Sequence, residues 1–430
     1  MNSGAATPLP VAGLPGWRDP AAWLTTADAL AVLIALSLPW STSLVGIFAI
    51  LWLVAIMPTL DLRRFRDLLK RPICLLPVGL FAIAAVGTLW SDAAWGARLY
   101  AVGPAAKLLM LPLLFYHFRH STRGMWVFVA FLVSCTLLMS MSWIVLLDPA
   151  ITLKRGDAER GIFVKNYIDQ SQEFALCAVA LAWPVIMLLR EKRVALAALL
   201  AALSLSFIFN MAVVIVSRTA LVTMPVMLAV FAALHLKWRS NLALLIAALL
   251  VAGLAWAASP QLRQTAAKFT RDYEIYKDLN QPTSIGMRLE FWQKSLRFFA
   301  EAPIIGHGTG STRGLFEQAA TGPRVLASGQ VIGNPHNQTL NVAVQWGIVG
   351  VVLLYAMWLA HLLLFRGEGL VPWLGLLVVV QNIFTSLFNS HLFDFHEGWM
   401  YVLGVGVAGG MTLKAGRQER AAAAARSGEP

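Results

Sequence analysis

Two arginines of this 430-residue chain occupy positions where a positive charge is expected to need an anionic partner. Arg218 lies in the short turn between two apolar runs, where a charge is costly unless an anionic group compensates it. Arg288 lies in the first turn of an amphipathic segment, where a positive charge opposes the helix dipole. Two alternatives remain open. Arg218 could extend to lipid headgroups, and Arg288 could pair with Glu290 or another nearby acid.

One histidine has the position of a general base. Asn334-Pro335 predicts a turn, because the residue before proline avoids the α region, and a helix of residues 340–364 is expected to begin just after His336. The dipole at a helix N-terminus disfavours a protonated imidazole, so His336 is predicted to be neutral and able to accept a proton. The alternative is a histidine that only caps the helix. Asn337 and Gln338, which follow it, are predicted to bind substrate.

Further polar candidates occur on the same predicted side of a membrane. Arg155, Arg160 and Lys165 form a second basic group, for which an anion site and a merely solvated loop are equally open. Lys107 falls inside an apolar span, where an ionisable group is a functional hypothesis by default, although backbone carbonyl contacts could suffice for it.

A glycine-rich run at residues 306–311 could hold an anion through its backbone amides. It is no Walker motif, because lysine is missing after the last glycine. His307 within the run and Arg313 just beyond it are predicted to contribute to substrate binding.

Metal and cofactor chemistry is not expected. His391, Asp394, His396 and Glu397 carry side chains that a metal could use, but no other His/Cys cluster supports a metal site, so substrate contact or hydrogen bonding within the bundle is preferred. The sequence also lacks an Asp-x-Asp pair, a phosphate loop, a nucleophile elbow and an HExxH motif. The predicted site therefore consists of arginines and a neutral histidine.

The elements that position these residues must lie in lipid. The chain is 58% hydrophobic and 13% charged, with a mean hydropathy of +0.68. Backbone groups in lipid must bond internally, so the apolar segments are predicted to be helices and the fold class all-α. About twelve transmembrane helices are expected. They lie near residues 28–39, 41–57, 73–91, 98–118, 125–147, 172–189, 194–216, 219–235, 242–259, 340–364, 372–388 and 399–413.

The domain boundaries follow from these spans. Residues 1–259 hold the first nine helices with a short periplasmic loop at 148–171, residues 340–414 hold the last three, and residues 415–430 form a cytoplasmic tail. Residues 260–339 form a large periplasmic loop that is too long to be a simple turn and is therefore expected to be functional.

The large loop contains helices of its own. Leu262–Leu279 has helical spacing, and Thr283 or Ser284 is expected to cap a second helix that runs through Phe299 and is stopped by Pro303. We expect this second helix to lie at the membrane surface, with one face formed by Met287, Phe291, Leu296 and Phe299.

Basic residues set the orientation. Arg63, Arg64, Lys70 and Arg190 fall in short loops that are cytoplasmic if the N-terminus is inside, as the positive-inside rule requires. The expected location is the inner membrane, with both termini cytoplasmic and the site facing the periplasm. The net charge of +12 is spread over such loops, so nucleic acid is not an expected partner. Residues 1–25 do not resemble a removable signal peptide.

Arginines and a base suit a substrate with a phosphate leaving group and an attacking hydroxyl. Outside the cytoplasm, the plausible donor is a sugar on a lipid pyrophosphate in the same membrane. Guanidinium groups would hold the pyrophosphate and remove the need for a metal, and His336 would deprotonate the acceptor. Without a carboxylate nucleophile in these segments, direct displacement with inversion is expected.

Three motifs carry a resemblance to a known family. Ser217-Arg218-Thr219, Met287-Arg288 with Trp292 and the glycine run, and Asn334-Pro335-His336-Asn337 before a late helix together resemble the O-antigen ligase and polymerase superfamily, most closely the ligases. The resemblance implies transfer of O-antigen from undecaprenyl pyrophosphate to lipid A-core, without metal or ATP, by residues matching Arg218, Arg288 and His336. His307 departs from the family pattern, which favours a small or apolar residue there.

Other functions share these motifs. An O-antigen polymerase or a protein O-oligosaccharyltransferase would use the same donor, and the single large loop favours the ligase only weakly. A lipid-linked sugar transporter would require charged residues at the membrane midplane, and only Lys107 fits that requirement.

Overall fold

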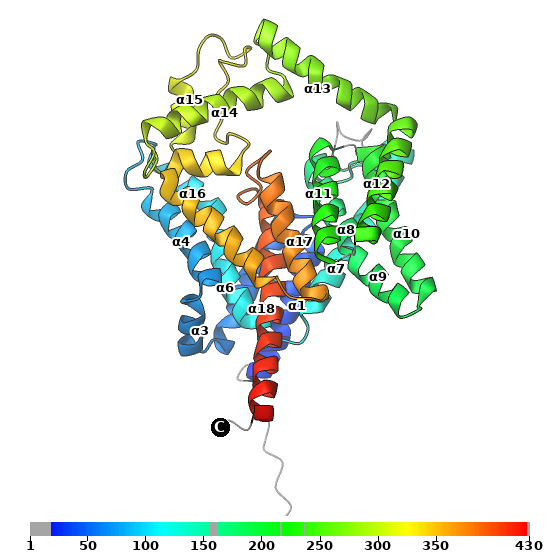
Figure 1. Cartoon of the computed structure of the whole chain (residues 1–430). Coiled ribbons are helices and arrows are strands. Elements are labelled where there is room, and N and C mark those ends of the chain that lie inside the picture. The colour runs from blue at the N-terminus through cyan, green and yellow to red at the C-terminus, as the bar shows by residue number, and fades with distance from the viewer. Residues whose placement is uncertain (1–18, 155–160, 216, 236–237, 428–430) are drawn as a thin grey trace, which may run out of the picture.

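The computed structural model describes residues 19–154, 161–215, 217–235 and 238–427 (Figure 1). Within them every regular element is helical, which confirms the predicted all-α class. The first helices are α1 Pro20–Ser37, α2 Thr42–Ile56, α3 Leu62–Leu69, α4 Pro72–Val86, α5 Trp95–Ala106, α6 Met110–Phe118, α7 Gly124–Leu147, α8 Tyr167–Ala180 and α9 Ala182–Arg190. The others are α10 Val194–Asn210, α11 Arg218–His235, α12 Trp238–Ala258, α13 Pro260–Leu279, α14 Ser284–Glu301, α15 Thr312–Gln318, α16 Gln338–Leu364, α17 Leu370–Thr385 and α18 Phe395–Ser427.

The protein is an integral membrane protein. Among the described residues, 7 helices are long and apolar enough to cross a bilayer, or 8 if α3 and α4, bent by 81°, form one span. Each predicted span coincides with one or two helices. The apolar part of α11 and helix α17 each have fewer than 18 residues, which is short for crossing a bilayer. The count of about twelve and the periplasmic position of the large loop therefore stay predictions.

Glycines let α18 pack closely against α6 in the centre of the bundle (Figure 1). A Cβ atom at Gly410 would come within 2.5 Å of the Phe118 Cβ, and one at Gly409 within 2.2 Å of the Phe115 ring. Small residues at such contacts allow helices in a membrane to approach each other. This packing places the start of α18, and the loop before it, in the middle of the molecule.

Helices α13, α14 and α15 lie beyond one end of the bundle, where α14 and α15 contact α16 and α13 connects α12 with α14 (Figure 1). Thr283 caps α14 by accepting a hydrogen bond from the Gly286 amide at 3.2 Å, as predicted. The predicted apolar face is partly wrong, because the side chain of Leu296 is 56% exposed whereas Phe291 and Phe298 are buried. These two rings pack with Phe316 of α15 and Val344 of α16, so this face contacts protein.

Helix α8 begins earlier than the sequence suggested. Residues 167–171 were predicted to belong to a loop, but Asn166 accepts hydrogen bonds from the amides of Ile168 and Asp169 and starts the helix at Tyr167. Capping by an asparagine satisfies the amides of the first turn. The earlier start places Asp169 on the same helix as Glu173, and both side chains are buried.

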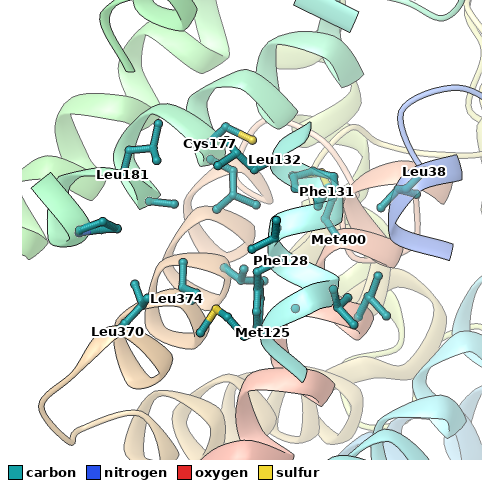
Figure 2. Close-up of a pocket in the computed structure, with 18 residues that line it drawn as sticks. Leu38, Met125, Phe128, Phe131, Leu132, Cys177, Leu181, Leu370, Leu374 and Met400 are labelled. Carbon is teal, nitrogen blue, oxygen red and sulfur yellow. The ribbon is translucent and has the colours of Figure 1, made fainter. Parts of the chain in front are cut away.

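An apolar pocket lies between α7, α8, α17 and α18 (Figure 2). Its walls include Phe128 and Leu132 of α7, Cys177 of α8 and Met400 of α18. Met400 is one helical turn from Glu397, so the pocket adjoins the polar region described next.

Candidate functional site

His336 lies at the N-terminus of α16, as the sequence predicted. Asn337 is the N-cap of this helix and accepts a hydrogen bond from the Leu340 amide at 3.0 Å. His336 has a φ of 53°, a left-handed conformation that is uncommon for a residue other than glycine. Its amide donates to the Asn334 side chain at 3.0 Å, which stabilises the turn. The local sequence therefore fixes the backbone that carries the imidazole.

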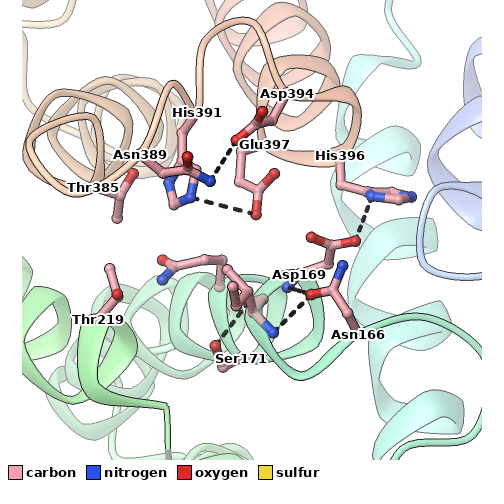
Figure 3. A network of polar contacts seen from close by, with 12 residues as sticks. Asn166, Asp169, Ser171, Thr219, Thr385, Asn389, His391, Asp394, His396 and Glu397 are labelled. Atoms are coloured by element: carbon pink, nitrogen blue, oxygen red, sulfur yellow. Dashed lines mark hydrogen bonds and ion pairs between the residues drawn. The ribbon is translucent and has the colours of Figure 1, made fainter. Parts of the chain in front are cut away.

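A side chain from another element sets the tautomer of His336. The Nδ1 atom lies 2.8 Å from the Asn389 Oδ1. The Asn389 Nδ2 donates to the Asp394 Oδ2 at 2.8 Å (Figure 3). Because Asp394 accepts from the amide nitrogen, the amide oxygen faces His336 and requires a proton on Nδ1. The Nε2 atom then carries the lone pair. This is the arrangement that a general base needs.

The surroundings favour the neutral imidazole. Burial lowers the pKa of His336, the Asn389 bond acts in the opposite direction, and the positive charge of Arg288 lowers it further. Arg288 of α14 thus acts on the same imidazole that α16 carries. Glu290, the alternative partner considered for Arg288, pairs with Lys294 at 3.2 Å and accepts from the Tyr276 hydroxyl at 2.9 Å.

Asn337 and Gln338 hold the loop of residues 386–394 against α16. The Asn337 Nδ2 donates to the Leu387 carbonyl at 3.0 Å, and the Gln338 Oε1 accepts from the Leu392 amide at 3.1 Å. These contacts position the loop that carries Asn389. A direct contact of Asn337 or Gln338 with substrate stays a prediction.

Lys107 also holds the loop of residues 386–394. Its Nζ donates to the carbonyl of Phe393 at 3.1 Å and to that of Asp394, so carbonyl contacts do account for this buried lysine. The carboxylates of Asp394 and Glu397 are also close enough to interact with its charge. Lys107 therefore stabilises the loop that orients His336.

Buried acids and histidines surround this loop (Figure 3). His391, Asp394 and Glu397 offer ligand atoms within 4.8 Å of one another, and the His391 Nε2 lies 3.9 Å from the Glu397 Oε1. These three could hold a cation. His396 instead lies with its Nδ1 2.6 Å from the Asp169 Oδ2, so the fourth side chain considered for a metal pairs with α8.

Asp169 and Glu173 were missed by the sequence reasoning. Glu173 is fully buried, and Asp169 and Glu173 are spaced by four residues on α8, just after its Asn166 cap. Two acids at that spacing lie on one face of a helix and were the available signal.

The glycine run is a packing element, and its amides are already used. The amides of His307, Gly308 and Thr309 donate to the carbonyls of Val344, Gln345 and Gly87 at 2.9 Å each, and that of Gly310 donates to the Gln345 Oε1 at 2.8 Å. The prediction of an anion site formed by these amides was therefore wrong. The His307 ring lies 2.8 Å from the Phe298 carbonyl and so binds the end of α14.

The remaining candidates are not gathered around His336 by any described contact. Arg313 pairs with Glu317 on the exposed face of α15 at 3.1 Å, and Lys165 donates to the Leu38 carbonyl. Arg155 and Arg160 lie outside the described residues. Arg218 begins α11, at the predicted break between two helices, and its side chain lies outside the described part of the chain. Thr219, its neighbour, is among the residues drawn around His391 (Figure 3).

Comparisons with known proteins agree with the resemblance that the motifs indicated. A family profile described as O-antigen ligase matches residues 203–355, a segment that includes Arg218, Arg288 and His336. An uncharacterized protein of Haemophilus influenzae is 26% identical over 195 residues, which are 42% of this chain and 48% of that protein. The matched region thus spans about half of that relative, whose name gives no activity. The family match supports the assignment to the O-antigen ligase superfamily.

Proposed function

We propose that this membrane protein, whose residues 203–355 match the O-antigen ligase family of glycosyltransferase-like enzymes, is itself an O-antigen ligase. It would transfer O-antigen from undecaprenyl pyrophosphate to a sugar hydroxyl of lipid A-core at the periplasmic face of the inner membrane. The observation that carries the proposal is His336, whose Nδ1 is bound to Asn389 and whose Nε2 is left to accept a proton beside Arg288.

The reaction is a single displacement. The His336 Nε2 takes the proton of the acceptor hydroxyl while the acceptor oxygen forms a bond to the anomeric carbon. The bond from that carbon to the pyrophosphate oxygen breaks, and undecaprenyl pyrophosphate leaves with the electron pair. One displacement inverts the anomeric configuration.

Arginines are the proposed counter-charges of the leaving group. Arg288 and Arg218 would bind the pyrophosphate oxygens, where guanidinium groups form paired, charge-assisted hydrogen bonds. Such bonds stabilise the charge that develops as the glycosidic bond breaks, so the reaction would need no metal. The apolar pocket beside Met400 supports a lipid-linked donor, since it offers a surface for part of the prenyl chain.

The function is tested by an in vitro transfer assay with purified protein, undecaprenyl-pyrophosphate-linked glycan and EDTA. Three acceptors are compared: lipid A-core, a growing O-antigen chain and a pilin-type protein. Transfer to lipid A-core is expected. Exclusive transfer to the glycan chain or to the pilin would instead identify an O-antigen polymerase or a protein O-oligosaccharyltransferase. Absence of transfer to all three, with donor movement across vesicles, would identify a transporter.

The role of His336 is tested in the same assay. His336→Ala is expected to lower the transfer rate by about 10²–10⁴-fold, the usual contribution of a positioned general base, while donor binding is retained. His120→Ala is the matched control, because His120 lies just after the span Trp95–Phe118 and its imidazole forms a hydrogen bond to the nearby Tyr116 carbonyl. Near wild-type transfer by His336→Ala would rule out the base.

A further inference from the structure

A cluster of arginines lies at the end of the bundle opposite to His336. The start of α4 is fixed beside the end of α16, since the His361 ring lies 3.0 Å from the Ile73 carbonyl. Beyond the kink at Gly347, residues 348–364 of α16 span about 25 Å at 1.5 Å per residue, so this end lies far from His336. The sequence predicts that it faces the cytoplasm.

Arg119 is at the centre of the cluster. It follows directly on α6 and is half-buried, with its guanidinium 5.9 Å from the centre of the Tyr116 ring. Its Nε atom is buried and has no hydrogen-bond partner among the described residues. A buried donor of this kind is costly unless an acceptor reaches it.

Hydrogen bonds bring other basic segments next to Arg119. The Tyr116 hydroxyl accepts from the Asp61 amide at 2.8 Å, which fixes the start of α3 beside the end of α6. The Lys414 Nζ donates to the Ser121 carbonyl at 3.0 Å, which fixes α18 just ahead of Arg417. These bonds place the start of α3 and the C-terminal part of α18 near the end of α6.

These positive charges act on one another. Burial lowers the pKa of Arg119, and the charges of Arg417, Arg71 and Arg64 lower it further. The nearby acids are already engaged. The Asp61 carboxylate caps α3 and lies 3.3 Å from the Arg64 Nε, and the Asp67 carboxylate pairs with Lys70 at 2.9 Å. Arg71, Arg119 and Arg417 are left with excess positive charge.

The three arginines lie at or beyond the ends of apolar helical segments. Arg71 directly precedes α4, and Arg119 directly follows the span Trp95–Phe118. Arg417 lies shortly beyond the residues of α18 that pack on α6, the last of which include Gly410 against Phe118. This is the boundary between hydrocarbon and water, where lipid phosphates lie.

We propose that Arg119, Arg71 and Arg417 form a binding site for the phosphate of an anionic phospholipid headgroup, which joins α4, α6 and α18 at the face opposite to His336. Guanidinium groups suit this ligand because each can donate two parallel hydrogen bonds to phosphate oxygens. The site is independent of glycosyl transfer.

The test uses the full chain, purified in detergent and delipidated. Short-chain phosphatidylglycerol, phosphatidylcholine of the same chain length, and inorganic phosphate are added separately, and bound lipid is counted by native mass spectrometry alongside thermal unfolding. Phosphatidylglycerol is expected to bind and raise the unfolding temperature. Inorganic phosphate with equal effect would show a soluble-anion site instead, and equal binding of both lipids would show that charge is not recognised; either result overturns the proposal.

Variants locate the site. Arg119→Gln and Arg417→Gln are each expected to weaken phosphatidylglycerol binding about fivefold, as one basic residue near an anionic surface contributes. Arg297→Gln is the matched control, because Arg297 is an exposed arginine of α14 that pairs with Glu301 at the other end of the molecule. If Arg119→Gln fails to fold, phosphatidylglycerol binding by Arg417→Gln, whose residue lies on the exposed surface of α18, tests the site. Unchanged binding by Arg417→Gln would overturn the assignment.

Discussion

At the scale of single residues, the bond from His336 to Asn389 determines which imidazole nitrogen can act. Asn389 lies 53 residues further along the chain, and its own amide is oriented by Asp394. An imidazole that is held in one tautomer does not populate the tautomer that cannot act as the base. Asn389 therefore contributes by orienting His336. Removing this acceptor should affect the chemical step more than substrate binding.

Asn389→Ala is therefore expected to lower kcat by roughly tenfold to a hundredfold with little change in KM, because the base is misoriented but still present. Asn389→Asp retains an acceptor for Nδ1–H and adds a negative charge that raises the pKa of His336. That variant should recover much of kcat and shift the acid limb of the pH–rate profile upward. An Asn389→Asp profile identical to wild type would contradict the positioning role.

The pH dependence of wild type follows from the lowered pKa of His336. Burial and the Arg288 charge keep the imidazole neutral at a pH where a free histidine, with a pKa of about 6.5, is half protonated. The base works only when neutral, so kcat/KM, which reports the free enzyme, should be lost as the pH falls through the lowered pKa and retained at pH 6.5. The measurement is kcat/KM against pH from about 4.5 to 8. A midpoint above 6.5 would contradict the assignment.

The position of His336 was predictable because its causes are local: the turn at Asn334-Pro335 and the Asn337 cap lie within three residues of it. Its partner was not. Asn389 comes from the loop after α17, and no local pattern specifies a contact between segments so far apart in sequence. The same reason explains why the pairing of Asp169 with His396 was missed.

At the scale of elements, glycines allow the close backbone contacts through which α14, α4 and α16 pack together. Gly306 has a φ of 65°, and a Cβ there would lie 2.5 Å from the backbone carbon of Gln345. Gly347 has a φ of 59° inside α16 and faces the Ile304 carbonyl in the same way. The glycine run is thus required by close backbone contacts that its composition alone did not reveal.

Gly306→Ala should consequently destabilise the protein by about 2–4 kcal/mol, since alanine is strained in the left-handed region and its methyl group meets fixed backbone. Gly314→Ala is the matched control. Gly314 lies in α15, where a Cβ atom would meet no neighbouring atom within 4 Å, so alanine there should be neutral or stabilise by up to about 1 kcal/mol. Thermal unfolding in detergent compares the two. Equal unfolding temperatures would contradict the packing role.

The extents of α13 and α14 were predicted well, because their caps and stop signals are local: Thr283 caps α14 and Pro303 follows it. The inward face of α14 was predicted less well. The predicted face included Leu296, but Phe298, seven residues from Phe291, shares the face of Phe291 and packs on Phe316 of α15. Periodicity defines a set of possible faces, and tertiary packing selects one.

At the scale of the whole molecule, composition determined the fold class but not the number of spans. An apolar chain in lipid must satisfy its backbone internally, so the all-helical result was predictable. The count of about twelve stays a prediction, because α3 and α4 meet at 81° and form one span only if the bent pair crosses together, and α17 is a shorter apolar helix. The orientation of the bundle rests on its basic loops alone.

That orientation can be measured by labelling with a membrane-impermeant maleimide. The native cysteines, Cys74, Cys135 and Cys177, are buried, so the wild-type protein should react weakly and serve as the background. Thr321→Cys, on the exposed segment beyond α15, should label in cells whose outer membrane alone is permeabilised, because the His336 end is predicted to face the periplasm. Glu419→Cys, exposed on α18 near the arginine cluster, should label only after the inner membrane is opened. The reverse pattern would place His336 in the cytoplasm, where a lipid-linked O-antigen donor for periplasmic ligation could not reach it.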